Sequence, residues 1–121
     1  MLARETNGDL SQALTHWREQ ATDAVTDTER KTLSRAAARR IVRTGFTLVM
    51  PRWHGWTSDL AASAQIFGRY YPHRAGQMCA AAATARTPTN DLAVLTMLID
   101  DLSPWLAAEY TATHGEKASR H

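Results

Sequence analysis

The sequence predicts an all-α fold, a single domain built as an up-and-down bundle of five or six helices. Every long segment repeats its apolar residues at intervals of three or four, and none shows the two-residue alternation of a strand. Four prolines, Pro51, Pro72, Pro88 and Pro104, interrupt this pattern and are expected to separate the helices. A chain of 121 residues with 44% hydrophobic residues can bury one core. We expect residues 9–113 to be ordered and residues 1–8 and 114–121 to be frayed.

Capping signals define the first two helices. The first is expected from about Asp9 to Val25, with Asp9 as its N-cap and a narrow apolar side. The second is expected to start at the T-D-T-E capping-box pattern of residues 26–29 and to run to Met50. Three arginines repeat every four residues along one edge of this second helix: Arg35, Arg39 and Arg43. Such a stripe is either a solvated face or a seat for phosphate or for an acidic partner surface.

The later helices follow from caps and prolines. A third helix is expected from Ser58 to Tyr71, and Pro72 suits the first position of a fourth, alanine-rich helix because its missing N–H needs no partner there. The lone cysteine, Cys79, is expected to be a small buried hydrophobe on that fourth helix. A fifth helix, about residues 92–102, carries the leucines expected at the centre of the core, and residues 105–113 are either a sixth short helix or an extension of the fifth.

Composition and charge limit the classes of function. The formal charge is only +2 and no recognition motif accompanies the arginines, so nucleic acid is not an expected partner. No stretch of eighteen apolar residues and no signal-like start occurs, so no membrane partner is expected. A single cysteine makes a reducing, cytoplasmic setting the default.

No cofactor or metal is predicted. The sequence lacks both glycine-rich phosphate-binding patterns, and none of its five histidines is four residues from another. Asp100 and Asp101 are the only adjacent acids, and neighbours on a helix diverge by about 100°. The two carboxylates are therefore expected to be solvated rather than to share a metal ion.

Two polar and aromatic junctions are the candidate binding sites. In R-W-H-G-W, residues 52–56, Trp53 and Trp56 could stack on a planar ligand and Arg52 could hold an anion; in the alternative, both tryptophans close the core. In R-Y-Y-P-H-R, residues 69–74, the ligand-binding candidates are Arg69, Tyr70 and Arg74; in the alternative, this is a helix junction with a buried Tyr71 and solvated charges. The candidate general acids or bases are His54 and His73. Because the third helix separates the junctions by about 20 Å, they are expected at opposite ends of the bundle unless a dimer brings them together.

Several short motifs resemble a known family. The runs R-T-G-F-T-L-V-M at 43–50, T-S-D-L at 57–60 and F-G-R-Y-Y-P-H-R at 67–74, followed by Gln77 and Met78, resemble the helical C-terminal region of small bacterial nucleotidyltransferase-domain proteins. The resemblance implies a helical bundle that packs beside a nucleotidyltransferase fold and shapes the acceptor-substrate side of its cleft. The catalytic half, a G-S turn followed by paired carboxylates, is missing from this chain. Only structural and rim positions transfer: Phe67, Tyr70, Tyr71 and Pro72.

Two hypotheses of function result. The first is a non-catalytic substrate-binding or partner-binding module that acts with a separate nucleotidyltransferase-type protein and contacts it through Arg35, Arg39 and Arg43. The second is a stand-alone small enzyme or ligand-binding protein, as a monomer or a homodimer, that uses the two junctions for acid–base chemistry on a small anionic or aromatic substrate.

Overall fold

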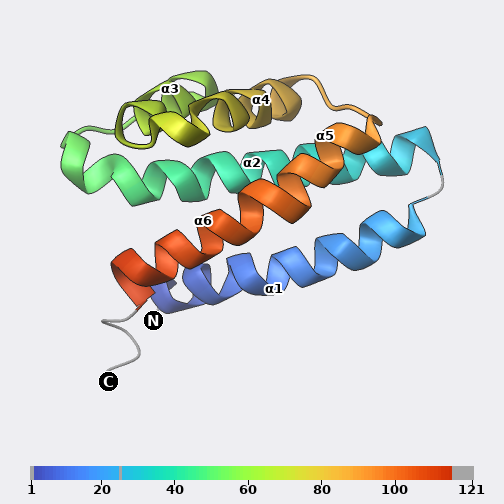
Figure 1. Cartoon of the computed structure of the whole chain (residues 1–121), viewed down its shortest axis with the longest axis horizontal. Coiled ribbons are helices and arrows are strands. Elements are labelled where there is room, and N and C mark those ends of the chain that lie inside the picture. Colours follow the sequence, from blue (N-terminus) through green and yellow to red (C-terminus); the bar gives the residue numbers. More distant parts are fainter. Residues whose placement is uncertain (1, 25, 116–121) are drawn as a thin grey trace.

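The protein is a bundle of α-helices with the long helix α2 at its centre (Figure 1). The computed structural model describes the backbone of residues 2–24 and 26–115, and within these ranges it contains no strand. Helices α3 (Leu60–Tyr70) and α4 (Ala75–Arg86) pack on one side of α2 (Asp27–Trp53). Helix α1 (Leu2–Asp23) and the helical run at residues 92–115 pack on its other side. The all-α prediction is therefore confirmed.

Helix α1 begins earlier than its sequence signals indicated. It starts at Leu2, so Asp9 is an internal residue and the prediction that it caps the helix was wrong. Leu10, Leu14 and Trp17 are buried, as their helical spacing requires, and they attach α1 to the rest of the bundle.

Helix α2 has the predicted start and a later end. The Thr26 hydroxyl accepts a hydrogen bond from the Glu29 N–H at 3.1 Å, and the Thr26 N–H donates to the Glu29 carboxylate at 3.1 Å, which is a complete capping box. The prediction that Pro51 breaks the helix was wrong, because the helix continues to Trp53. A proline removes one intrahelical hydrogen bond, and here only Arg52 and Trp53 follow it in the helix. The chain leaves the helix at His54, which has a left-handed φ of 61° and donates its N–H to the Met50 carbonyl.

Asp59 and Pro72 set the limits of the α3–α4 hairpin. The Asp59 carboxylate accepts a hydrogen bond from the Ala62 N–H at 2.8 Å and caps α3. Pro72 starts a helix as predicted, but its first turn is a separate 3₁₀ helix, η1 (Pro72–Arg74), before α4. On α4, Cys79 is exposed, so the prediction that it is buried was wrong.

The last helices follow one another without a break from residue 92 to residue 115, a run named here the C-terminal helix. Its parts are α5 (Leu92–Thr96), the π-helical turn η2 (Met97–Leu102), α6 (Ser103–Tyr110) and the π-helical turn η3 (Thr111–Gly115). Residues 105–113 are therefore an extension of the fifth helix. The prediction that Pro104 separates two helices was wrong. Directly before this proline both the N–H and the hydroxyl of Ser103 donate to the Leu98 carbonyl, the hydroxyl at 2.6 Å.

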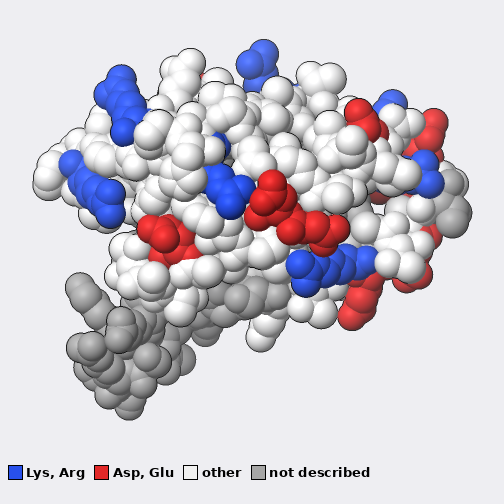
Figure 2. All heavy atoms as spheres, viewed as in Figure 1, with Lys and Arg blue, Asp and Glu red and all other residues white. Residues whose placement is uncertain are grey.

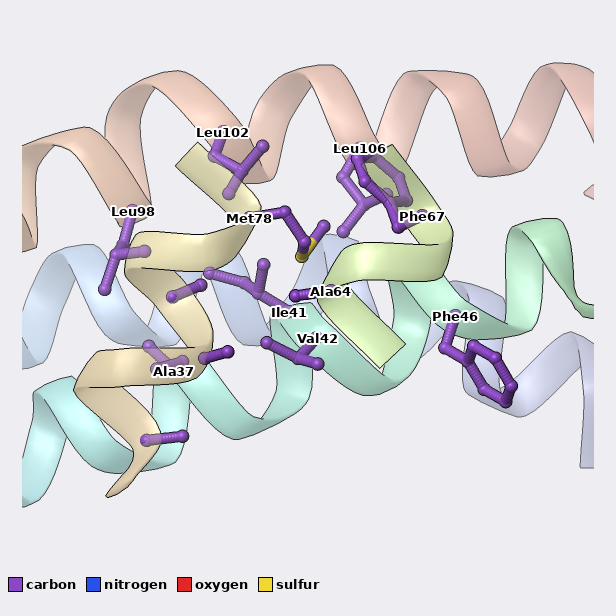
Figure 3. Packing of buried hydrophobic residues seen from close by; sticks show 14 of the residues in the cluster. Ala37, Ile41, Val42, Phe46, Ala64, Phe67, Met78, Leu98, Leu102 and Leu106 are labelled. Carbon is purple, nitrogen blue, oxygen red and sulfur yellow. The ribbon is translucent and has the colours of Figure 1, made fainter. Parts of the chain in front are cut away.

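The core lies where α3, α4 and the C-terminal helix meet α2. Met78 lies between Ile41 of α2 and Leu102 of the C-terminal helix (Figure 3), and all three side chains are fully buried. Leu95, Leu98, Ile99 and Leu102 are buried as predicted, whereas Leu92 is 56% exposed because it stands at the first residue of α5. Gly45 lets α3 and α4 approach α2 closely, since a β-carbon there would lie 2.6 Å from the Met78 methyl carbon.

Candidate functional site

The two predicted junctions lie at the same end of the bundle. The guanidinium carbon of Arg52, in the last turn of α2, is 5.8 Å from the ring centroid of Tyr70 and 5.9 Å from that of Tyr71. The prediction that α3 holds the junctions apart was therefore wrong. Residues 55–59 are an irregular linker, which at up to about 3.3 Å per residue can span the roughly 16 Å length of α3. The end of α3 thus returns to the end of α2.

Tyr71 is the centre of this junction and is part of the core. Its ring stacks on Phe67 with centroids 5.0 Å apart and meets the edge of Trp105 at 5.2 Å. Its hydroxyl donates a 2.9 Å hydrogen bond to the Glu109 carboxylate. Burial raises the pKa of Tyr71, the Glu109 carboxylate raises it further, and Arg52 opposes both effects. The prediction of a buried Tyr71 is confirmed, and its hydroxyl ties α3 to α6.

Trp105 organises the other side of the R-Y-Y-P-H-R turn. The His73 ring meets its edge at 5.6 Å, and the Arg74 guanidinium lies 5.1 Å from its ring centroid. Arg74 also forms a 3.0 Å ion pair with Asp101 and a 2.8 Å hydrogen bond with Gln77. The guanidinium is thus already committed within the protein, and Arg74 holds η1 against the C-terminal helix.

The adjacent acids Asp100 and Asp101 point to different helices, as their spacing predicted. Asp101 accepts hydrogen bonds from Arg74 and from Gln77, and both donors hold the pKa of its carboxyl below the usual value. Asp100 instead pairs with Arg18 of α1 at 3.1 Å. Together the two carboxylates fasten the C-terminal helix to α4 and to α1.

The remaining predicted site residues divide into packed and exposed groups. Trp53 meets the edge of Phe46 at 5.9 Å and packs against the core, whereas Trp56 is 72% exposed. The exposed members of the predicted sites are Arg35, Arg39, Arg43, Arg52, His54, Trp56, Arg69 and His73. Trp105 and Glu109 complete the junction but were not predicted, because no short-range pattern links them to His73 and Tyr71, which lie more than 30 positions away along the chain.

Two surface grooves lie away from these junctions, both beside α1. A groove of about 390 Å³ is lined by residues of α1 and α2, including Gln20, Thr32 and Leu33. A second, of about 340 Å³, runs between α1 and α5 past Ala21, Leu95 and the Arg18–Asp100 pair. Neither groove is lined by a predicted site residue.

Comparisons with known proteins do not assign a family. No family model, no curated protein and no solved structure matches this chain. In the part of the chain that the structure describes, no helix is long and apolar enough to cross a membrane. Across the same residues, no three His, Cys, Asp or Glu side chains gather as a metal site would require.

Charge is divided unequally along the chain, which the total of +2 conceals. Residues 30–90, named here the basic segment, contain ten Lys and Arg residues and one acid, Asp59, for a formal charge of +9. The other residues contain four basic residues and eleven acids, for a formal charge of −7. The basic segment forms most of α2 and all of α3 and α4. In Figure 2 acidic side chains follow the C-terminal helix, whereas the charged side chains at the upper left, around the end of α2, are basic.

Proposed function

We propose that the protein is a non-catalytic helical module that acts with a separate catalytic protein. Its basic surface would bind either an anionic substrate or the catalytic protein itself. The observation that carries the proposal is the basic segment, with its +9 charge gathered on three adjacent helices. Like charges kept together repel one another and cost stability, so their concentration is more economically explained by binding than by solubility.

The arginine stripe is the best-defined part of this surface. Arg35, Arg39 and Arg43 are all exposed, and within the described side chains none of their guanidinium groups forms a hydrogen bond or an ion pair. Four residues of helix rise by about 6 Å, so the stripe places three guanidinium groups at regular intervals along α2. Each guanidinium group can form two parallel hydrogen bonds to one carboxylate or phosphate group. A row of three such groups suits an extended anionic partner.

The resemblance to the helical region of nucleotidyltransferase-domain proteins supports one identity for the catalytic partner. We extend the proposal to a nucleotidyltransferase-type protein that supplies the missing G-S turn and paired carboxylates. The single cysteine suits a reducing compartment, so the proposed setting is the bacterial cytoplasm.

The test is the mass and composition of the complex that the full chain forms in its own cells. We would purify the affinity-tagged native protein in parallel with a variant that carries Arg35→Gln, Arg39→Gln and Arg43→Gln. Light scattering then gives the mass of each complex. We expect the native chain to retain a stoichiometric partner that carries a nucleotidyltransferase site, and the variant to lose it. A native chain that elutes only as a partner-free homodimer would contradict the proposal.

One observation favours the second hypothesis, a ligand-binding protein that acts alone. Arg52, Tyr70 and His73 gather at a single end of the bundle, so a small aromatic anion could contact all three. His73→Ala and His54→Ala variants separate the two ideas. Loss of a measured small-molecule activity in either variant would support the stand-alone enzyme, and unchanged partner binding in both would support the module.

A further inference from the structure

We infer that the basic segment binds single-stranded nucleic acid. The inference rests on the proposed function, because it assigns a chemical class to the anionic substrate of the same surface. Three features carry it: the kind of basic residue, an exposed aromatic side chain on the same segment, and the way α2 is covered by its neighbours.

The basic residues are almost all arginine. Nine of the ten basic residues in residues 30–90 are arginines, and Lys31 is the exception. A surface that needed only positive charge could use either residue type, but the planar guanidinium binds phosphate through two parallel hydrogen bonds and also stacks on bases. Seven of the ten are exposed: Lys31, Arg35, Arg39, Arg43, Arg52, Arg69 and Arg86. They lie on all three helices, from the first half of α2 to the end of α4, so the positive charge is spread over the segment rather than gathered at a single anion site.

Trp56 is an exposed aromatic side chain on the same segment. Its side chain is 72% exposed, although a tryptophan gains most from burial, and it lies in the linker between α2 and α3. Tyr70 is a second, half-buried ring with the Arg52 guanidinium 5.8 Å from its centroid. Basic side chains interleaved with exposed aromatic rings are how proteins hold single strands without reading sequence.

The position of α2 favours a single strand over a duplex. A recognition helix must project far enough to enter the major groove of DNA. Here α2 is covered by α3 and α4 on one side and by α1 and the C-terminal helix on the other (Figure 1). Its arginine edge, Arg35, Arg39 and Arg43, is exposed. The sequence did not predict a nucleic-acid partner, because the total charge is low and no recognition motif is present. Single-strand binding without sequence preference requires neither of these features.

Fluorescence anisotropy with a labelled 12-nucleotide single strand of mixed sequence tests the inference. The native chain is titrated at several salt concentrations between 50 and 200 mM. We expect the triple variant R35Q/R39Q/R43Q to bind on the order of 100-fold more weakly at 50 mM salt, with a salt-dependence slope shallower by about 2, since each lost phosphate contact removes about 0.7. We expect Trp56→Ala to weaken binding roughly tenfold with an unchanged slope, because stacking releases no counterions.

A charge-matched variant controls for total charge. Gln12→Glu, Gln20→Glu and Ala93→Glu change the net charge by the same −3 at exposed positions outside the basic segment. We expect this variant to keep most of the native affinity and the native slope. Circular dichroism of every variant verifies that the helices are intact.

Two competitors distinguish the possible failures. Tighter binding of a matched DNA duplex, or displacement of the single strand by poly-glutamate of equal charge at equal concentration, would overturn the inference. The second result would leave the proposed function intact with an acidic protein as its partner. Native protein that binds neither the single strand, the duplex nor poly-glutamate would overturn the inference and the proposed function together.

Discussion

Gly45 allows a quantitative test of how α2 is packed. In the change Gly45→Ala, the new β-carbon would lie 2.6 Å from the Met78 methyl carbon and 3.2 Å from an aromatic carbon of Phe67. Alanine gains about 1 kcal/mol of helix propensity over glycine in a helix interior. Overpacking a closed core costs about 1–3 kcal/mol, and both neighbouring side chains are fully buried. We therefore expect Gly45→Ala to lower the free energy of unfolding by about 1 kcal/mol.

Gly76 and Met78 provide the controls for this prediction. A β-carbon on Gly76 would meet nothing within 4 Å, so Gly76→Ala should raise the free energy of unfolding by about 0.5 kcal/mol. Met78→Ala alone should cost about 3 kcal/mol, and in that background Gly45→Ala should become stabilising because the clash is gone. Urea unfolding followed by circular dichroism measures the native protein and these four variants. If Gly45→Ala stabilises the native protein as much as Gly76→Ala does, the close approach of α4 to α2 at Gly45 is refuted.

Three further predictions concern ionisation and capping. Because the pKa of Tyr71 is raised above 10.0, the folded state holds its proton more tightly, and the associated stability should be complete below pH 10 and lost as the pH rises further. Tyr71→Phe should remove this alkaline loss from urea unfolding curves, and identical curves for both proteins at pH 8–11 would refute it. The pKa of Asp101 is lowered from 3.8, so its ion pair with Arg74 should stabilise the fold above pH 3.8. This stability should be lost as the pH falls through the lower pKa of the folded state. Asp101→Asn should therefore reduce the fall of Tm at acid pH in a series of thermal melts. Thr26→Ala should cost about 1 kcal/mol and lower Tm by about 4 °C in calorimetry, and an unchanged Tm would show that the capping box contributes nothing.

Features that depend on neighbouring residues were predictable from the sequence. The Thr26 capping box and the helix start at Pro72 each depend on residues within one turn, and both are present. The same local reasoning failed at Pro51 and Pro104, because a proline ends a helix only where the missing hydrogen bond cannot be spared or replaced. A sequence window cannot tell whether a proline near a helix end will be tolerated.

The candidate junction was only partly predictable because its contacts are distant in sequence. The motif around Tyr71 marked the position, but Trp105 and Glu109 reach it only after the C-terminal helix has packed across α3. Placing Arg52 beside Tyr70 depended on the path of the linker, which carries no helical or strand pattern. By contrast, the charge of the basic segment was present in the sequence and was concealed only by summing over the whole chain.

The unequal division of charge also gives the molecule a permanent electric dipole moment. With the basic segment at +9 and the rest of the chain at −7, the half formed by α2, α3 and α4 and the half formed by α1 and the C-terminal helix are the two poles. When a polyanion comes within a Debye length, about 8 Å at physiological salt, the protein experiences a torque that turns the half formed by α2, α3 and α4 toward it. Orientation would then precede contact, so that many encounters which begin in the wrong orientation would still lead to binding.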